Sequence, residues 1–267
     1  MTTFICVTCG TQFAASAEPP AGCPICLDER QYLGVDGQQW TTPEELREAH
    51  QTRVAEIEPG LVGIGVEPPF AIGQRALHVE TLLWDCVPLV DDNAAAVVEA
   101  HGGLETIAVS HPHYYTTMVD WADRFDARVL LHEADREWVM RPSPRIEYWS
   151  GERRTISDAV ELFRLGGHFA GGTVCLWRDG ADGRGALLSG DIVQVVSDRD
   201  WVSFMWSYPN LIPLPAAEIE RIRAIVESLE FDRIYGAWWD RVIDADAKAK
   251  VVRSARRYVD AITRERR

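Results

Sequence analysis

The stretch TIAVSHPH, residues 106–113, joins a short apolar run to two histidines that are one residue apart. Its first four residues are mostly β-branched and apolar, which predicts a buried strand. Two imidazoles at positions i and i+2 beyond such a strand can bind one metal ion from the same loop, and neutral histidine is a common metal ligand. We therefore expect His111 and His113 to be metal ligands.

Two later segments end in the same way. Residues 160–165 predict a strand that runs into the tripeptide GGH at 166–168, where glycine allows a positive φ and a close backbone approach. Residues 186–188 predict another strand, which is followed by SGD at 189–191. Three imidazoles and one carboxylate suit either zinc or iron. The predicted ligands of this site are His111, His113, His168 and Asp191.

The remaining periodic segments predict a mixture of helices and strands. A short helix should begin at Thr42-Pro43, because threonine can cap a helix and proline suits its first turn. Residues 92–100 and 246–263 predict further helices, and residues 82–89 predict a strand. Strands come first, and helices and strands then alternate. This order predicts an α/β (α+β) fold with two mixed sheets and helices outside.

These motifs, in this order, resemble those of the metallo-β-lactamase-fold metallohydrolases over about residues 55–267. The segment LWDC at 83–86 is similar to the strand that carries the family's early aspartate, and SHPH at 110–113 to the first half of its HxHxDH motif. GGH and SGD match the family's third-motif histidine and its bridging aspartate. The resemblance implies an αββα sandwich with His111, His113, His168 and Asp191 as metal ligands.

The chain departs from the family pattern at the second metal position. The aspartate and histidine that complete the HxHxDH motif would fall at Tyr115 and Thr116. The family's last histidine should follow the strand near Ile234, where Ala237-Trp238-Trp239 stands instead. The resemblance therefore implies a single metal ion. It also implies that the aspartate which orients the attacking water in relatives is missing here.

Four cysteines near the N-terminus form two CxxC pairs, Cys6 with Cys9 and Cys23 with Cys26. Each pair directs two sulfurs to one point, and the S4 set suits zinc or, in a rubredoxin-like centre, iron. About 40 residues bury little core, so the metal would contribute folding free energy. With four protein ligands the site should be structural, and the knot could also dock a protein partner. We expect this knot over residues 1–40 and the metallo-β-lactamase-like domain over 41–267.

Other polar and aromatic side chains are candidates for roles near the histidines. Tyr115, beside the metal loop, could donate to an oxyanion, or it could simply pack. His132 ends a predicted strand and could take part in catalysis, although a capping role would also explain it. The aromatic run around Trp201, Phe204 and Trp206 could cover the site as a lid or belong to the core.

The composition excludes some classes of function. The chain has 41 acidic and 27 basic residues, a net charge of −14, which argues against nucleic-acid binding. No apolar segment approaches the roughly 20 residues that span a bilayer, and the N-terminus does not resemble a signal peptide. We expect a cytoplasmic protein without nucleic-acid or membrane partners.

The leading hypothesis is a metal-dependent hydrolase that acts on a small molecule of the ester, lactone, thioester or amide class. One zinc or iron ion would activate water, with Asp191 as a ligand or proton acceptor. A mononuclear non-haem iron oxygenase or oxidoreductase is an alternative, because two histidines and Asp191 could form a facial triad. A non-catalytic binding module with a degenerate site is the third hypothesis.

Overall fold

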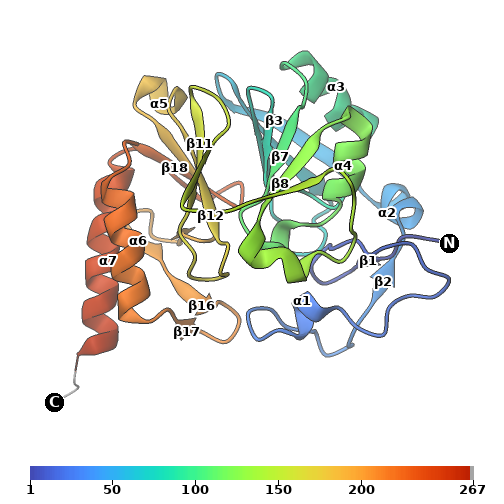
Figure 1. Ribbon diagram of the computed structural model, residues 1–267, viewed down its shortest axis with the longest axis horizontal. Helices are drawn as coiled ribbons and strands as arrows, with labels where there is room; N and C mark the ends of the chain where they lie inside the picture. The colour runs from blue at the N-terminus through green and yellow to red at the C-terminus, as the bar shows by residue number, and fades with distance from the viewer. Residues whose placement is uncertain (265–267) are drawn as a thin grey trace. The chain divides into compact units, whose positions relative to one another are not determined.

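The computed structural model describes residues 1–264. They fall into two compact units, and the boundary along the chain lies between residues 149 and 150. Figure 1 colours the chain from the N-terminus in blue to the C-terminus in red. Within the described residues, none of the helices combines the length and the apolar composition needed to cross a bilayer. Each unit has its own sheet, and each is described separately below.

The first unit is built on a seven-stranded sheet with strand order β3-β4-β5-β6-β7-β8-β9. The pairings from β3 to β6 are antiparallel, and those from β6 to β9 are parallel. The strands are β3 (Gln51–Glu58), β4 (Leu61–Glu67), β5 (Ala76–Val79), β6 (Leu82–Trp84), β7 (Thr106–Ala108), β8 (Arg128–His132) and β9 (Ile146–Trp149). The carboxyl ends of parallel strands meet at one edge, where ligands commonly bind. This edge therefore receives the segments that follow β6, β7 and β8.

Helices and short 3₁₀ turns make the parallel connections of this unit. Helix α3 (Asp92–Ala100) contacts β3, and α4 (Met118–Phe125) contacts β7 and β8 (Figure 1). The predicted helix over 92–100 is confirmed, with its cap bond from the Ala94 N–H to the side chain of Asp91. The 3₁₀ turns are η1 (Pro112–Tyr114) and η2 (Glu133–Trp138).

Two features of this sheet differ from the sequence prediction. Strand β6 ends at Trp84, not at Leu89, because Asp85 adopts a left-handed φ of +60° and turns the chain out of the sheet. Strand β3 was not predicted at all. It is the edge strand of the sheet, and few of its side chains are buried, so its sequence lacks a clear apolar alternation.

The N-terminal segment belongs to the first unit and contains β1 (Ile5–Cys6), α1 (Pro24–Leu27), β2 (Trp40–Thr41) and α2 (Pro43–Ala49). Helix α2 begins at the predicted place: the Glu45 N–H donates to the Thr42 hydroxyl, and the Glu45 side chain accepts from the Thr42 N–H. The buried cysteines pack against Trp138 and Met140 of the same unit. A separate domain over residues 1–40 stays a prediction.

The second unit has a six-stranded sheet with strand order β10-β11-β12-β13-β18-β19. Only the pairing of β13 with β18 is parallel among the described strands of this sheet. The strands are β10 (Arg153–Thr155), β11 (Val160–Arg164), β12 (Thr173–Trp177), β13 (Ala186–Gly190), β18 (Arg233–Gly236) and β19 (Val242–Ile243). A turn of helix, α5 (Gly180–Gly183), joins β12 to β13.

Two helices contribute to the core that covers this second sheet. Helices α6 (Ala216–Glu227) and α7 (Ala247–Thr263) lie side by side in orange and red in Figure 1. Buried Ile222 and Val251 from these helices pack in one cluster with Leu176 and Leu187 of the sheet. Two small ribbons complete the unit: β14 (Gln194–Val195) with β15 (Val202–Ser203), and β16 (Met205–Ser207) with β17 (Ile212–Pro213). They are too short for sequence periodicity to predict.

Candidate metal centres

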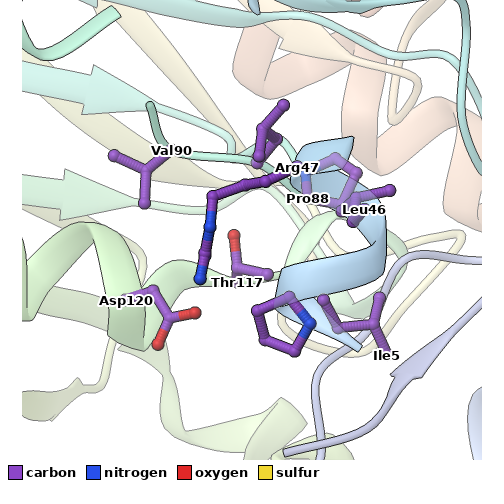
Figure 2. Close-up of a pocket in the computed structure, with 9 residues that line it drawn as sticks. Ile5, Leu46, Arg47, Pro88, Val90, Thr117 and Asp120 are labelled. Carbon is purple, nitrogen blue, oxygen red and sulfur yellow. The ribbon is translucent and has the colours of Figure 1, made fainter. Parts of the chain in front are cut away.

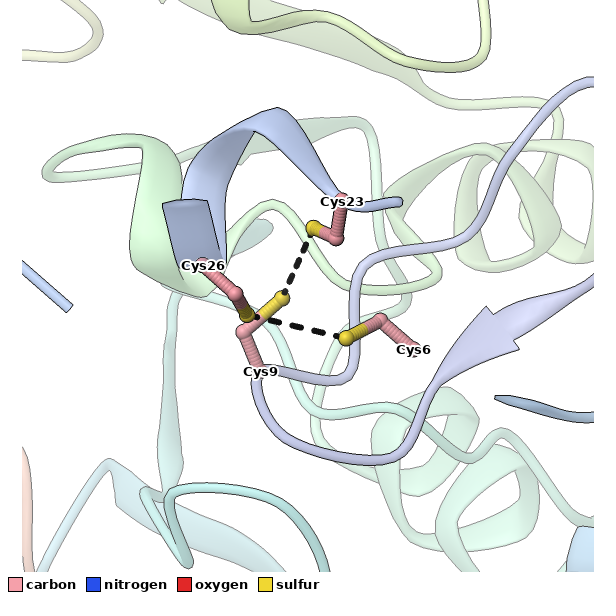
Figure 3. A group of neighbouring side chains, drawn as sticks. All are labelled: Cys6, Cys9, Cys23 and Cys26. Atoms are coloured by element: carbon pink, nitrogen blue, oxygen red, sulfur yellow. Dashed lines mark hydrogen bonds between the residues drawn. The ribbon is translucent and has the colours of Figure 1, made fainter. Parts of the chain in front are cut away.

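The four N-terminal cysteines form a closed group of sulfurs. Their Sγ atoms lie within 4.8 Å of one another, with 3.6 Å between Cys6 and Cys26 and 3.7 Å between Cys9 and Cys23. Figure 3 shows the four side chains converging from the turn after β1 and from the start of α1. All four are buried. This is the arrangement that the two CxxC pairs predicted.

The backbone around these cysteines is shaped to present the sulfurs. The Gly10 N–H donates to the Cys6 carbonyl oxygen at 2.8 Å, and Gly10 has the left-handed φ of +79° that closes this turn. On the other side, the Gln38 amide donates to the Cys6 sulfur at 3.2 Å and accepts from the Cys23 N–H at 3.0 Å. The turn and the amide together orient both CxxC pairs.

The donor chemistry fits a tetrahedral thiophilic metal ion. Hydrogen bonding among the thiols lowers the pKa of Cys6 and raises the pKa of Cys9, because one sulfur of such a contact must keep the proton. A divalent cation that displaces the remaining protons would remove this conflict. Four sulfurs at these spacings suit zinc or iron.

The first histidine pair lies in the loop that follows β7. Buried His111 and His113 have ring centroids 5.0 Å apart. The Ser110 hydroxyl lies 2.9 Å from His111 Nδ1 and holds the ring by that atom, so Nε2 is the candidate ligand atom. Tyr114 packs against the same ring, with 4.4 Å between centroids. His111 is therefore held by its own loop, and its ring contacts that of His113.

Asp85 supports the histidine loop from the neighbouring strand. Its carboxylate accepts from the Ser110 N–H at 2.7 Å, and its own N–H donates to the Ala108 carbonyl at 2.8 Å. Burial raises the pKa of Asp85 to about 7, and the bond from Ser110 opposes this shift. The left-handed φ at Asp85 that ended β6 is what aims the carboxyl group at the loop.

Tyr115 and Thr116 occupy the two positions at which the family motif has aspartate and histidine. Both are buried. Burial is the largest cause that raises the pKa of Tyr115 well above 10, and the negative charge of Asp135 adds to it, so the phenol keeps its proton. Thr116 has a positive φ of +35°, which is unusual for a β-branched residue.

The second unit holds the other two candidate ligands. Buried His168 lies in the loop after β11, where the N–H groups of Leu165 and Gly166 both donate to the Gly172 carbonyl oxygen at 2.7 and 2.8 Å. His168 Nδ1 lies 2.7 Å from the carbonyl oxygen of Trp206, so this nitrogen carries the proton and donates. Its Nε2 atom is then the candidate ligand atom.

Asp191 directly follows β13 and is also buried. Its backbone carbonyl oxygen accepts from the Tyr208 hydroxyl at 2.7 Å. Trp206, on β16, and Tyr208, just after it, therefore support His168 and Asp191 respectively. The sequence carried no signal for these two contacts, because they join residues that are 38 and 17 positions apart in the chain.

The structure gives other roles to part of the predicted lid. Phe204 is fully buried in the core of the second unit, so of the two alternatives for this residue the structure supports core packing. Trp206 packs on the same core, and Trp201 stacks against Arg257, whose guanidinium carbon lies 3.4 Å from the ring centroid. Packing therefore explains these aromatic side chains.

His132 ends β8, as predicted. Its Nδ1 atom accepts from the Ala134 N–H at 3.2 Å and caps η2, and its ring meets Trp149 edge to face with 4.6 Å between centroids. These contacts describe a structural role, and a catalytic role for His132 stays a prediction. The two remaining cysteines, Cys86 and Cys175, are buried as expected.

Two hollows of the first unit are respectively too small and too open to enclose a substrate. One cavity of about 10 Å³, room for a single water molecule, lies between α2 and the start of α4 (Figure 2). A wider, open hollow of about 480 Å³ lies between α1 and η2, beside the exposed side chain of Leu27. A protein partner for the knot stays a prediction.

Comparison with known proteins supports the fold and identifies a close relative. No model of a known protein family matches this chain. The chain is similar to "Uncharacterized protein YmaE" of Bacillus subtilis (strain 168), with 48% identity over 268 residues, which cover 98% of this chain and 97% of that protein. An identity this high over nearly both full lengths shows common family membership.

Solved metallo-β-lactamases are similar in fold at low sequence identity. DIM-1 metallo-β-lactamase matches with a TM-score of 0.57 and 15% identity over 78% of this chain and 98% of that chain. FIM-1 from Pseudomonas aeruginosa, in its mono-zinc form, matches with a TM-score of 0.56 and 13% identity over 78% and 96%. The predicted αββα fold class is confirmed by these matches. The chain has the metallo-β-lactamase fold and belongs to the family of Bacillus subtilis YmaE.

Proposed function

We propose that this protein is a metal-dependent hydrolase of a small molecule. One metal ion would be held by His111, His113 and His168, with Asp191 beside it as a further ligand or as the proton acceptor. The observation that carries the proposal is the way in which two imidazole rings are held at their Nδ1 atoms. His111 and His168 are each held at Nδ1 by a neighbour, as metal-binding histidines usually are. Three buried imidazoles and one buried carboxylate form a donor set that suits zinc.

The proposal requires both units to contribute to one site. The similarity to metallo-β-lactamases supports this requirement, because it extends over 78% of the chain and so includes strands of both units. In this fold the predicted ligands come from both halves of the chain. His111 and His113 would supply one side of the site, and His168 and Asp191 the other.

The reaction we propose is attack of water on an acyl carbon. A bound zinc ion would supply Lewis-acid chemistry, lowering the pKa of water and polarising the acyl oxygen. The Asp191 carboxylate would take up the proton that water releases. The Tyr115 phenol, which burial keeps protonated, would donate a hydrogen bond to the developing negative charge. His132 would pass a proton to the leaving group.

We propose a single metal ion at this site, because the second position lacks its ligands. Tyr115 and Thr116 replace the aspartate and histidine of the motif, and Ala237 rather than histidine follows β18. The FIM-1 structure, a mono-zinc form, supports the idea that the fold accommodates one zinc ion. In the cysteine knot we propose a structural zinc, since the four sulfurs leave no position for a substrate.

Metal analysis combined with activity assays tests this function. Purified protein should contain two metal ions per chain, and His111→Ala should lose one of them together with hydrolysis of the active class among esters, lactones, thioesters and amides. The matched control is His101→Ala, which changes an exposed histidine at the end of α3. Three metal ions per chain would contradict the single-ion site. A filled site that hydrolyses none of these classes would contradict the hydrolase, and iron with oxygen uptake would indicate an oxygenase instead.

A further inference from the structure

The cysteine knot lies directly against the loop that follows the histidine pair. The backbone N–H of Gln12 donates to the carbonyl oxygen of Thr116 at 3.1 Å. Gly10 lies so close to the same residue that a Cβ added to it would be 3.3 Å from Thr116 Cγ2. Thr116 comes three residues after His113 and has the positive φ of +35°. The strained end of the histidine loop is therefore held by the knot.

A second connection runs through the side chain of Gln12. Its amide nitrogen donates to Asp120 Oδ2 at 2.8 Å, and its amide oxygen accepts from the guanidinium of Arg141, which also pairs with Asp120. Asp120 is in the first turn of α4, the helix that begins just after this loop. Figure 2 shows Asp120 and Thr117 facing the same small cavity. Gln12, only 2% exposed, thus connects the knot to both ends of residues 116–120.

The position of Gln12 depends on the cysteine turn. The Cys6 N–H donates to the Thr11 carbonyl at 2.9 Å, and the Cys9 thiol lies 3.3 Å from the Thr11 hydroxyl. The surrounding elements are a two-residue strand and a four-residue helix, which provide few other constraints. Metal binding is what orders a small segment of this kind. A filled knot therefore holds Gly10 and Gln12 in place against Thr116.

We propose that the filled cysteine knot positions His111 and His113 for metal binding, with Gln12 and Thr116 as the contacts that connect the two centres. The inference rests on the proposed metal site at the histidines. Gln12 is a positioning residue: it acts on the ligands through Thr116 and Asp120. In relatives that follow the full motif, the position of Thr116 carries a metal ligand, whereas here its backbone serves as an anchor for the knot.

The test measures metal affinity rather than activity. Cobalt(II) is titrated into the full-length chain, the histidine site is identified by the signal lost in His111→Ala, and the knot is followed by its cobalt–thiolate absorption. Gln12→Ala keeps the backbone bond to Thr116 but removes the side-chain bonds to Asp120 and Arg141. We expect it to raise the Kd of the histidine site about tenfold, a typical effect of removing an outer support of a metal ligand. Its knot should stay filled, and the visible spectrum of cobalt at the histidines should shift.

Two further variants make the outcome decisive. Gln38→Ala removes contacts to Cys6 and Cys23 but touches no residue of the histidine loop, so it should leave the Kd unchanged while its knot is filled. Asp120→Asn keeps the size of the side chain and weakens the same connection from its other end, so it should raise the Kd. If a folded Gln12→Ala or Asp120→Asn variant binds cobalt as tightly as wild type, this inference is overturned and the proposed function stands. If wild type binds no metal at the histidines, both are overturned.

Discussion

Nδ1 of His168 and the backbone carbonyl oxygen of Trp206 lie 2.7 Å apart, although 38 residues separate them in the chain. The carbonyl can only accept, so it selects the His168 tautomer that carries its proton on Nδ1. Two residues further on, the Tyr208 hydroxyl bonds to the backbone of Asp191. One short segment of the second unit thus orients both of that unit's candidate ligands.

Removing the Tyr208 hydroxyl should leave Asp191 less well positioned for metal binding. In Tyr208→Phe the ring stays in place, but the 2.7 Å bond to the Asp191 carbonyl oxygen is lost. Because such outer contacts orient metal ligands, we expect the metal Kd of the histidine site to rise about tenfold. Competition with a chromophoric chelator measures it. Tyr258→Phe changes a half-buried phenol on α7 and should leave the Kd unchanged. An equal response of both variants would show that the Tyr208 bond has no special role.

Replacing Asp85 by alanine should lower the free energy of unfolding more than replacing it by asparagine. In Asp85→Ala the buried Ser110 N–H loses its acceptor, which should destabilise the fold by about 1–3 kcal/mol. Asparagine retains an acceptor oxygen and tolerates the left-handed φ of +60°. Urea unfolding of both metal-free variants measures the difference. Equal free energies of unfolding would contradict the role assigned to the bond between Asp85 and Ser110.

Adding a side chain at Gly172 should disturb the loop that carries His168. A Cβ there would lie 2.6 Å from the Gly166 carbonyl oxygen, so the backbone must shift. We expect Gly172→Ala to lower both the melting temperature and the metal affinity at His168. The matched control is Gly34→Ala, where an added Cβ meets no atom within 4 Å and both quantities should stay as in wild type. Wild-type affinity in Gly172→Ala would show that the loop adapts.

His78 should make the stability of the first unit depend on pH. Burial lowers its pKa below the ordinary value of 6.5, and the bond between Nε2 and the Gly103 carbonyl oxygen only partly opposes this. The folded state therefore favours the neutral ring, while the unfolded chain takes up a proton near pH 6.5. The His78 contribution is present above that pH and is lost as the pH falls below it.

Replacing His78 tests this assignment. His78→Gln keeps a donor for Gly103 but cannot titrate, so its free energy of unfolding should fall less steeply than that of wild type between pH 7 and pH 5. Denaturant titrations of the metal-free proteins at several pH values measure both slopes. Parallel curves for the two proteins would contradict the assignment to His78.

The elements that could be predicted are those whose signal is local. The two CxxC pairs at Cys6 and Cys23 predicted the sulfur cluster because the spacing alone directs each pair to one point. Helix α2 was predicted from Thr42 and Pro43, which are adjacent in the chain. Strand β7, which precedes the histidine pair, was predicted because its short run of apolar and β-branched residues reflects burial on both faces. Edge strand β3 has no such run and was missed.

By itself, the sequence determined the identity of the candidate ligands and the order in which strand ends present them, since both depend on neighbours along the chain. Only the tertiary structure decided what supports those ligands. Gln12 meets Thr116 across 104 positions of sequence, and His168 meets Trp206 across 38. Such contacts arise when whole elements pack, and no local spacing encodes them. The same packing placed Phe204 in the core rather than in a lid.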